Sequence, residues 1–124
     1  MSKKEKLQAS WKYILKNWRY VESPDYRYKK GWEVKNAYWC LESDRGDCMA
    51  QGAAFAFIGN ACGYTGCCSV SSGGHGWAEV KGRVCDPTWA KVDKKHNYFM
   101  MKMSLSGKNR RPRYKTNRKH VYKI

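Results

Sequence analysis

Three residues of this chain, Cys48, His75 and Asp86, have the types and the order that a cysteine-dependent acyl transfer needs. A thiolate attacks a carbonyl carbon, an imidazole takes up and returns the proton, and a carboxylate holds the imidazole in the useful tautomer. Taken singly, His75 reads as an ordinary strand histidine and Asp86 as the first residue of an Asp-Pro turn. Taken together, in the elements that the sequence predicts around them, the three favour a catalytic triad.

Cys48 is expected at the N-terminus of a helix. It follows a turn at residues 43–47 and opens a run rich in glycine and alanine that extends to residue 62, where Gly63 suits a helix end. A helix N-terminus near an imidazole favours a thiolate, and its free backbone N–H groups can bind an oxyanion. Asp47 complicates this, because its charge opposes a thiolate unless the carboxylate turns away to cap the helix. The small side chains also predict that neighbouring elements approach this helix closely.

A β-hairpin is expected to carry the other two residues. Residues 75–80 and 83–86 read as strands, and Lys81-Gly82 is a compact turn between them. A two-residue loop pairs Val80 with Arg83, Ala78 with Cys85 and Trp77 with Asp86. His75 shares a face with Trp77 and therefore lies diagonally beside Asp86, within hydrogen-bonding reach. A slip of one residue in register would place the two on opposite faces.

These motifs resemble those of the transglutaminase-like superfamily of papain-type cysteine enzymes. Three segments carry the resemblance: Arg45-Gly46-Asp47-Cys48 with its alanine-rich helix and Gly63-Tyr64, then His75-Gly76-Trp77-Ala78-Glu79-Val80, then Asp86-Pro87-Thr88-Trp89. It implies that Cys48 is the nucleophile, His75 the base and Asp86 the orienter, over roughly Trp11 to Trp89. Two features depart from the pattern, a short loop from Gly63 to His75 and a glycine at position 76 where such enzymes often have alanine. No calcium-loop pattern is present, which argues against a calcium-regulated crosslinker.

The expected fold class is α+β, with N-terminal helices and a central nucleophile-bearing helix packed on an antiparallel sheet, as in a transglutaminase-like or papain-like core. A first helix carries an apolar stripe and ends near Tyr20, and a second, at residues 32–41, places Val34, Ala37, Tyr38 and Leu41 on its apolar side. Further strands are expected at residues 64–71, 97–105 and 120–124. Residues 1–107 are expected to form one domain, and residues 108–124 a basic C-terminal extension that adds an edge strand.

Trp39, Trp77 and Trp89 are candidate substrate-binding residues. With Tyr38, their rings are suited to line an acyl-binding cleft, where an indole N–H can serve as a second oxyanion donor. The alternative is that they pack in the core. The remaining cysteines lack Cys-x-x-Cys spacing, so zinc is disfavoured and no cofactor or metal is expected.

Composition sets the chain among folded proteins with a strong positive charge. Aromatic residues make up 15% of the chain, enough to contribute to a hydrophobic core. The formal net charge is +15. Basic residues continue to Lys123 although no acidic residue follows Asp93, so the C-terminal end suits polyanions, or serves only for solubility. No apolar run predicts a signal peptide or a membrane span, and we expect a cytoplasmic protein with reduced thiols, or a secreted one with disulfides if a leader has been removed.

The sequence therefore favours an enzyme that attacks a peptide bond or a glutamine carboxamide through a thioester intermediate, with a protein or peptide as substrate. Hydrolysis is favoured over transfer to an amine, since nothing in the sequence indicates how water would be excluded. The alternative is a non-catalytic basic module that binds nucleic acid or another polyanion on the same scaffold. Oligomeric state is left open.

Overall fold

The fold was analysed in a computed structural model, which describes residues 1–24, 29–103 and 112–124. In that part of the chain the elements follow one another as α1 (Lys3–Asn17), β1 (Arg19–Tyr20), α2 (Trp32–Ser43), β2 (Arg45–Gly46), α3 (Cys48–Ala61), β3 (Cys67–Ser71), β4 (Gly76–Val80), β5 (Arg83–Cys85), α4 (Pro87–Val92) and β6 (His120–Lys123). Helices and an antiparallel sheet occur together, which confirms the α+β class.

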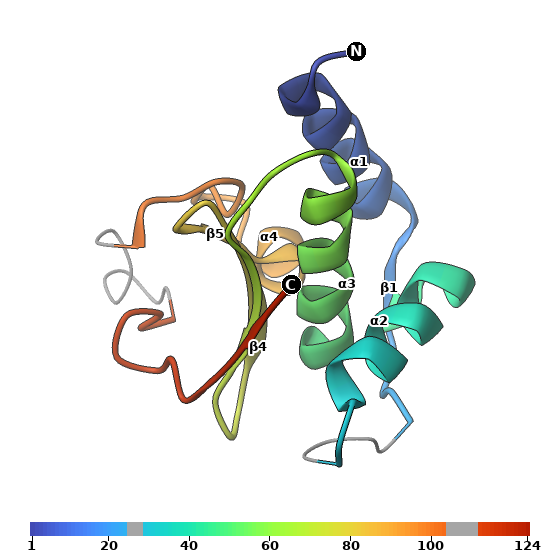
Figure 1. Ribbon diagram of the computed structural model, residues 1–124, viewed down its shortest axis with the longest axis vertical. Coiled ribbons are helices and arrows are strands. Elements are labelled where there is room, and N and C mark those ends of the chain that lie inside the picture. The colour runs from blue at the N-terminus through green and yellow to red at the C-terminus, as the bar shows by residue number, and fades with distance from the viewer. Residues whose placement is uncertain (25–28, 104–111) are drawn as a thin grey trace.

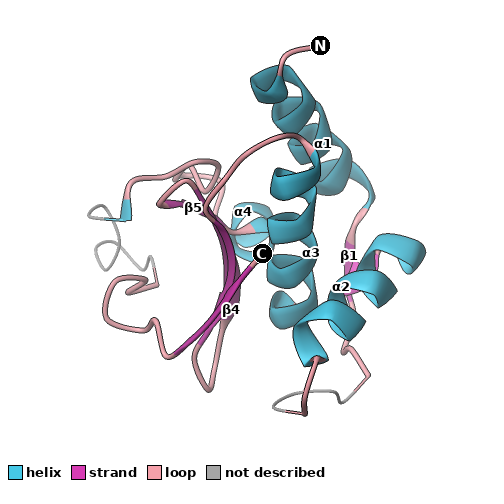
Figure 2. Ribbon diagram, in the orientation of Figure 1, coloured by secondary structure: helices cyan, strands magenta, loops and turns pink. Residues whose placement is uncertain are grey.

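The main sheet has the strand order β5-β4-β3-β6, and all its neighbours are antiparallel. Helix α3 packs on one face of this sheet and stands between it and the helices α1 and α2 (Figure 1). The opposite face is covered by loops that follow α4, drawn in orange and red in Figure 1 and as loop in Figure 2. Because α3 is covered on both sides, most of its residues are buried.

Helix α3 and strand β4 meet backbone to backbone. A Cβ added at Gly52 would stand 2.7 Å from the main chain of Trp77, and one added at Gly76 would stand 2.8 Å from the Cα of Met49. Contacts this short leave no room for a methyl group on either glycine. The close approach predicted from the small residues of α3 is confirmed, and it sets the distance between the start of the helix and the strand after His75.

The hairpin between β4 and β5 has the expected register. Val80 pairs with Arg83 and Ala78 with Cys85. The two turn residues, Lys81 and Gly82, have φ angles of 53° and 75°, which are the left-handed values that a type I′ turn requires. Asp86, expected as the last strand residue, instead follows β5 and caps α4, its side chain accepting the N–H of Trp89. The chain turns there because Pro87 supplies the fixed φ of a first helical residue.

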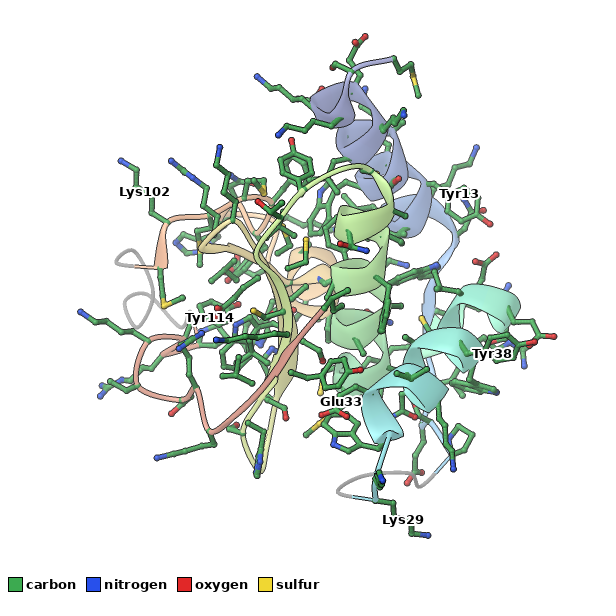
Figure 3. All side chains as sticks on the ribbon, in the orientation of Figure 1. Tyr13, Lys29, Glu33, Tyr38, Lys102 and Tyr114 are labelled. Carbon is green, nitrogen blue, oxygen red and sulfur yellow. The ribbon has the colours of Figure 1, made fainter. Side chains whose placement is uncertain are left out.

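Helix α2 buries a different face from the predicted one. Ala37 is buried, but Val34, Tyr38 and Leu41 are exposed, and Tyr38 stands on the outer side of the helix (Figure 3). The buried positions are Trp32, Asn36, Ala37 and Cys40. Asn36 is polar and was not among the predicted inward positions, but the face of α2 that packs against α3 includes it.

The prediction of a strand at residues 97–105 is wrong for residues 97–103. Residues 104 and 105 lie outside the described part of the chain. A single bridge joins Met101 to Val84. Met100 has a φ of 52°, which interrupts an extended backbone. Earlier in the same segment, the Asp93 carboxylate binds the side chains of His96 and Tyr98. A folded loop thus replaces the strand.

The C-terminal residues pack onto the sheet. The expected edge strand at residues 120–124 is confirmed as β6, which pairs with β3. Tyr114 is fully buried, and its ring meets that of Trp77 edge to face at 5.0 Å. Figure 3 shows Tyr114 on the side of the sheet away from α3. A short parallel pairing of β1 with β2 was not predicted. None of the described helices is long and apolar enough to cross a membrane.

Candidate active site

Cys48 is the first residue of α3, as predicted, and its side chain is half-buried. Asp47 directly before it is the helix cap: its Oδ1 accepts the N–H of Ala50 at 3.0 Å. The other carboxylate oxygen accepts the N–H of Ser23 at 3.4 Å, and the Ser23 hydroxyl accepts the Asp47 N–H at 3.0 Å. The Asp47 carboxylate is therefore held in the helix cap. This is the arrangement that the sequence analysis required if its negative charge is not to oppose a thiolate at Cys48.

His75 and Asp86 form a hydrogen-bonded pair. The His75 Nε2 lies 2.6 Å from the Asp86 Oδ2. The predicted hairpin geometry is confirmed, since Asp86 lies within reach although it is outside the strand. Asp86 is fully buried, and two further donors fix its carboxylate: the Tyr114 hydroxyl at 2.7 Å from Oδ2 and the Trp89 N–H at 3.0 Å from Oδ1. Three donors on one carboxylate leave it little freedom to rotate.

His75 also interacts with the side chain of Cys48, and the two residues line the same pocket. Burial lowers the pKa of the imidazole, but the hydrogen bonds to Asp86 and Cys48 and the charges of both outweigh it and raise the pKa to about 10. His75 is consequently protonated at neutral pH, and the structure brings all three predicted residues together in one chain of contacts.

A second set of residues supports the His75 ring. The Trp77 indole stacks beside it, with ring centroids 5.8 Å apart. The indole N–H donates to Glu79 Oε2 at 3.1 Å, and Arg118 binds the same carboxylate with Nε and Nη2, each at 3.0 Å from a carboxylate oxygen. The C-terminal segment therefore reaches the imidazole by two routes, Tyr114 through Asp86 and Arg118 through Glu79 and Trp77.

Tyr20 is a site residue that the sequence reasoning missed. Its side chain lines the same pocket as Cys48, and both the backbone and the side chain of Cys48 influence the Tyr20 hydroxyl. Burial, followed by the charges of Cys48 and Asp47, raises the pKa of Tyr20. The parallel pairing of Tyr20 with Gly46 holds the tyrosine at this place. The position of Tyr20 beside Cys48 depends on this long-range pairing, so no local sequence pattern indicates it.

Cys48 and His75 line a pocket of about 370 Å³, whose walls include Tyr20, Gln51, Thr88, Trp89 and Lys91. The volume is near the lower end of the range for small-ligand sites. Gln51 is buried and held by two hydrogen bonds: its Nε2 donates to the Gly46 carbonyl at 2.9 Å, and its Oε1 accepts from the Thr88 hydroxyl at 2.8 Å. A hollow of about 380 Å³ beside Tyr13 and Ile14 has no cysteine or histidine among its described lining residues.

The three candidate substrate-binding tryptophans lie in different places. Trp89 lines the pocket. Trp77 is 1% exposed and stacks beside His75 instead, so it supports the imidazole. Trp39 lies on α2 and is not among the described residues that line the pocket. Its backbone carbonyl accepts a hydrogen bond from the Ser43 hydroxyl. Neighbouring Tyr38 points to solvent.

Other thiols differ from Cys48 in their surroundings. Burial raises the pKa of Cys40 and of Cys85 to about 12, and it also raises the pKa of Cys67 and Cys68. None of these sulfurs has an imidazole against it in the described part of the chain. The six cysteines are all present as free thiols. Among the described residues no cluster of histidine, cysteine and carboxylate side chains is suited to a metal ion.

Comparison with known proteins adds no assignment: no family model, no curated protein and no solved structure matches this chain. Any functional statement therefore depends on the geometry of Cys48, His75, Asp86 and the pocket that the first two line.

Proposed function

We propose that this protein is a cysteine-dependent acyl-transfer enzyme, with Cys48 as nucleophile, His75 as acid and base, and Asp86 as the residue that orients His75. The observation that carries the proposal is the continuous contact from the Cys48 side chain to His75 and, at 2.6 Å, to the Asp86 carboxylate, beside a pocket. A nucleophile, a base hydrogen-bonded to it and a third group that orients the base are the requirements of covalent catalysis.

In the proposed reaction the Cys48 sulfur attacks as a thiolate, with the protonated His75 beside it. The sulfur attacks the carbonyl carbon of an amide, and the C–N bond breaks as His75 gives its proton to the leaving amine. A thioester on Cys48 remains. Neutral His75 then takes a proton from water, the hydroxide attacks the thioester carbon, and the carboxylic acid and the thiolate are released.

Two donors beside Cys48 suit the oxyanion that forms during each attack. They are the backbone N–H of Cys48 and the hydroxyl of Tyr20, which lines the same pocket. An incoming carbonyl oxygen would accept hydrogen bonds from this N–H and from the hydroxyl. Tyr20 is thus proposed as the second oxyanion donor, the role that the sequence analysis expected of a tryptophan indole N–H.

The transglutaminase-like assignment is part of the proposal. What supports it is a cysteine at the first position of a central helix, packed on an antiparallel hairpin that carries the histidine before one strand and the aspartate after the next. Glycine at position 76 fits this chain because α3 lies closer to β4 than a methyl group allows. Hydrolysis is proposed over transfer to an amine, since Cys48 is half-buried and within reach of water.

Two measurements test the enzyme proposal. The first is alkylation with iodoacetamide at neutral pH, with peptide mapping by mass spectrometry; we expect selective labelling of Cys48 that disappears in His75→Ala. The second is incubation with p-nitrophenyl acetate, for which we expect a burst of nitrophenol and an acetyl group on the Cys48 peptide. Uniform slow labelling of all six thiols, together with no burst above the Cys48→Ala level, would rule the enzyme out.

The alternative of a polyanion-binding module is favoured by one observation. Arg113, Lys115, Lys119 and Lys123 are exposed along the C-terminal segment, whereas Arg118 is engaged by Glu79. Binding of DNA or of an acidic polysaccharide through these side chains would weaken steeply with salt. A salt titration with both polymers would separate this property from amide chemistry.

A further inference from the structure

Lys91 brings a cation to the pocket of Cys48. It lies on α4 and lines the pocket together with Cys48 and His75. Its ammonium donates one hydrogen bond, to the backbone carbonyl of Trp18 at the C-terminal end of α1. An ammonium has three N–H donors. Two of them are therefore available to a ligand, on a side chain that is anchored at the wall of the pocket.

The charge of Lys91 has no counter-ion from the protein in the part of the chain that the structure describes. No aspartate or glutamate is among the described residues that line the pocket. Burial lowers the pKa of Lys91, and the second influence is another cation, Lys94. An anion that binds here pairs with an ammonium that no described carboxylate neutralises, and this attraction stabilises the bound anion.

His75 does not take the place of this anion partner. Its Nε2 binds the Asp86 carboxylate, and the imidazole also interacts with the Cys48 side chain. The imidazolium charge is thus balanced within the triad, and Lys91 is the cation in the pocket that a substrate can neutralise.

We propose that the enzyme acts on acyl groups that carry a carboxylate, which the Lys91 ammonium binds while Cys48 attacks the scissile carbonyl. The inference rests on the proposed acyl-transfer function and narrows its substrate class to amides with an acidic acyl side, such as peptides with an aspartyl, glutamyl or free carboxylate group at that position. The pocket volume of about 370 Å³ suits one such side chain. Lys91 is then a specificity residue, because the negative charge is bound at a wall of the pocket.

The test uses two esters with acyl chains of equal length, mono-p-nitrophenyl glutarate, which carries a carboxylate, and p-nitrophenyl valerate, which is neutral. The quantity measured is the ratio of their kcat/KM values. We expect the protein to prefer the glutarate ester and Lys91→Gln to lower the ratio by about fivefold, the effect of one solvent-accessible ion pair. Lys91→Arg is expected to retain the preference. Lys94→Gln is the matched control, an exposed neighbouring cation outside the pocket, and should change the ratio little.

The outcomes separate the two levels of the proposal. A ratio that is the same in Lys91→Gln and in the unaltered protein overturns the substrate inference and leaves the triad untouched. A fall of equal size in Lys94→Gln also overturns it, because the preference would then come from the general positive field. If neither ester is cleaved faster than by Cys48→Ala, the enzyme proposal fails and the inference fails with it. Thermal unfolding of each variant shows whether a changed ratio arises from a changed fold.

Discussion

The Tyr114 hydroxyl and the His75 imidazole donate to the same carboxylate oxygen of Asp86, at 2.7 Å and 2.6 Å. Tyr114 comes from the C-terminal segment and Asp86 from the cap of α4, so two distant parts of the chain meet at the orienting carboxylate. Since the Asp86 carboxylate also accepts a backbone N–H, its orientation is fixed from three sides. A carboxylate held in this way directs the imidazole toward Cys48 without a large entropic cost.

Replacing Tyr114 with phenylalanine tests this brace. The ring is retained against Trp77, and only the hydroxyl is lost. We expect the free energy of unfolding to fall by about 1–2 kcal/mol, because a buried carboxylate loses a donor. The rate of Cys48 alkylation should also fall several-fold, as Asp86 becomes free to rotate. Urea unfolding and iodoacetamide kinetics measure the two effects. An unchanged alkylation rate would mean that Tyr114 has no part in orienting the triad.

Gly76→Ala tests the contact between helix and strand. The added methyl group would stand 2.8 Å from the Cα and 3.2 Å from the N of Met49, main-chain atoms that can move only if α3 moves. We expect a loss of about 1–3 kcal/mol in stability, as in other overpacked cores, and slower alkylation of Cys48 as the helix start is pushed away from His75. Gly73→Ala is the control, since nothing lies within 4 Å of its added Cβ. Equal effects in both variants would contradict the argument.

Tyr20→Phe separates oxyanion stabilisation from thiol activation. Alkylation by iodoacetamide forms no tetrahedral oxyanion, whereas hydrolysis of p-nitrophenyl acetate does. We expect the alkylation rate to change little and kcat for the ester to fall by about 100-fold, the usual effect of removing one oxyanion donor. Tyr13→Phe is the control, because that hydroxyl is also exposed but binds Asp44, away from the pocket. A parallel fall in both rates would instead indicate that Tyr20 positions or activates the sulfur.

The raised pKa of His75 predicts a dependence of stability on pH. The pKa rises from an ordinary 6.5 to about 10 on folding, so the folded state binds the proton more tightly than the unfolded chain. The resulting stabilisation is fully present below pH 6.5 and is lost as pH rises through 10. His75→Gln lacks this contribution. We therefore expect the difference in unfolding free energy between the protein and His75→Gln to shrink between these limits, measured by urea titration at each pH. A constant difference would contradict the shift.

Local patterns predicted the elements that carry the site. The cap before Cys48, the glycine- and alanine-rich helix and the two-residue turn all act within a few residues, so the start of α3 and the register of the hairpin could be read directly. The distance between His75 and Asp86 followed from that register. The pairing of the two side chains needed no knowledge of the rest of the molecule.

Features that depend on distant contacts could not be read in this way. Tyr20 reaches Cys48 through the pairing of β1 with β2, and Tyr114 reaches Asp86 across the far face of the sheet. The buried face of α2 was predicted wrongly because Asn36 is polar, and a tertiary contact overrode its preference for water. The segment near Met101 forms a loop where a strand was predicted, because Asp93 binds the side chains of His96 and Tyr98.

The route from Arg118 and Tyr114 back to the triad has a consequence for how the protein matures. Translation proceeds from the N-terminus, so Cys48, His75 and Asp86 all leave the ribosome before the two residues that brace them. A nascent chain lacking the last segment holds its imidazole less firmly. The Cys48 sulfur is therefore expected to reach full reactivity only after Tyr114 and Arg118 have left the ribosome and packed against the sheet.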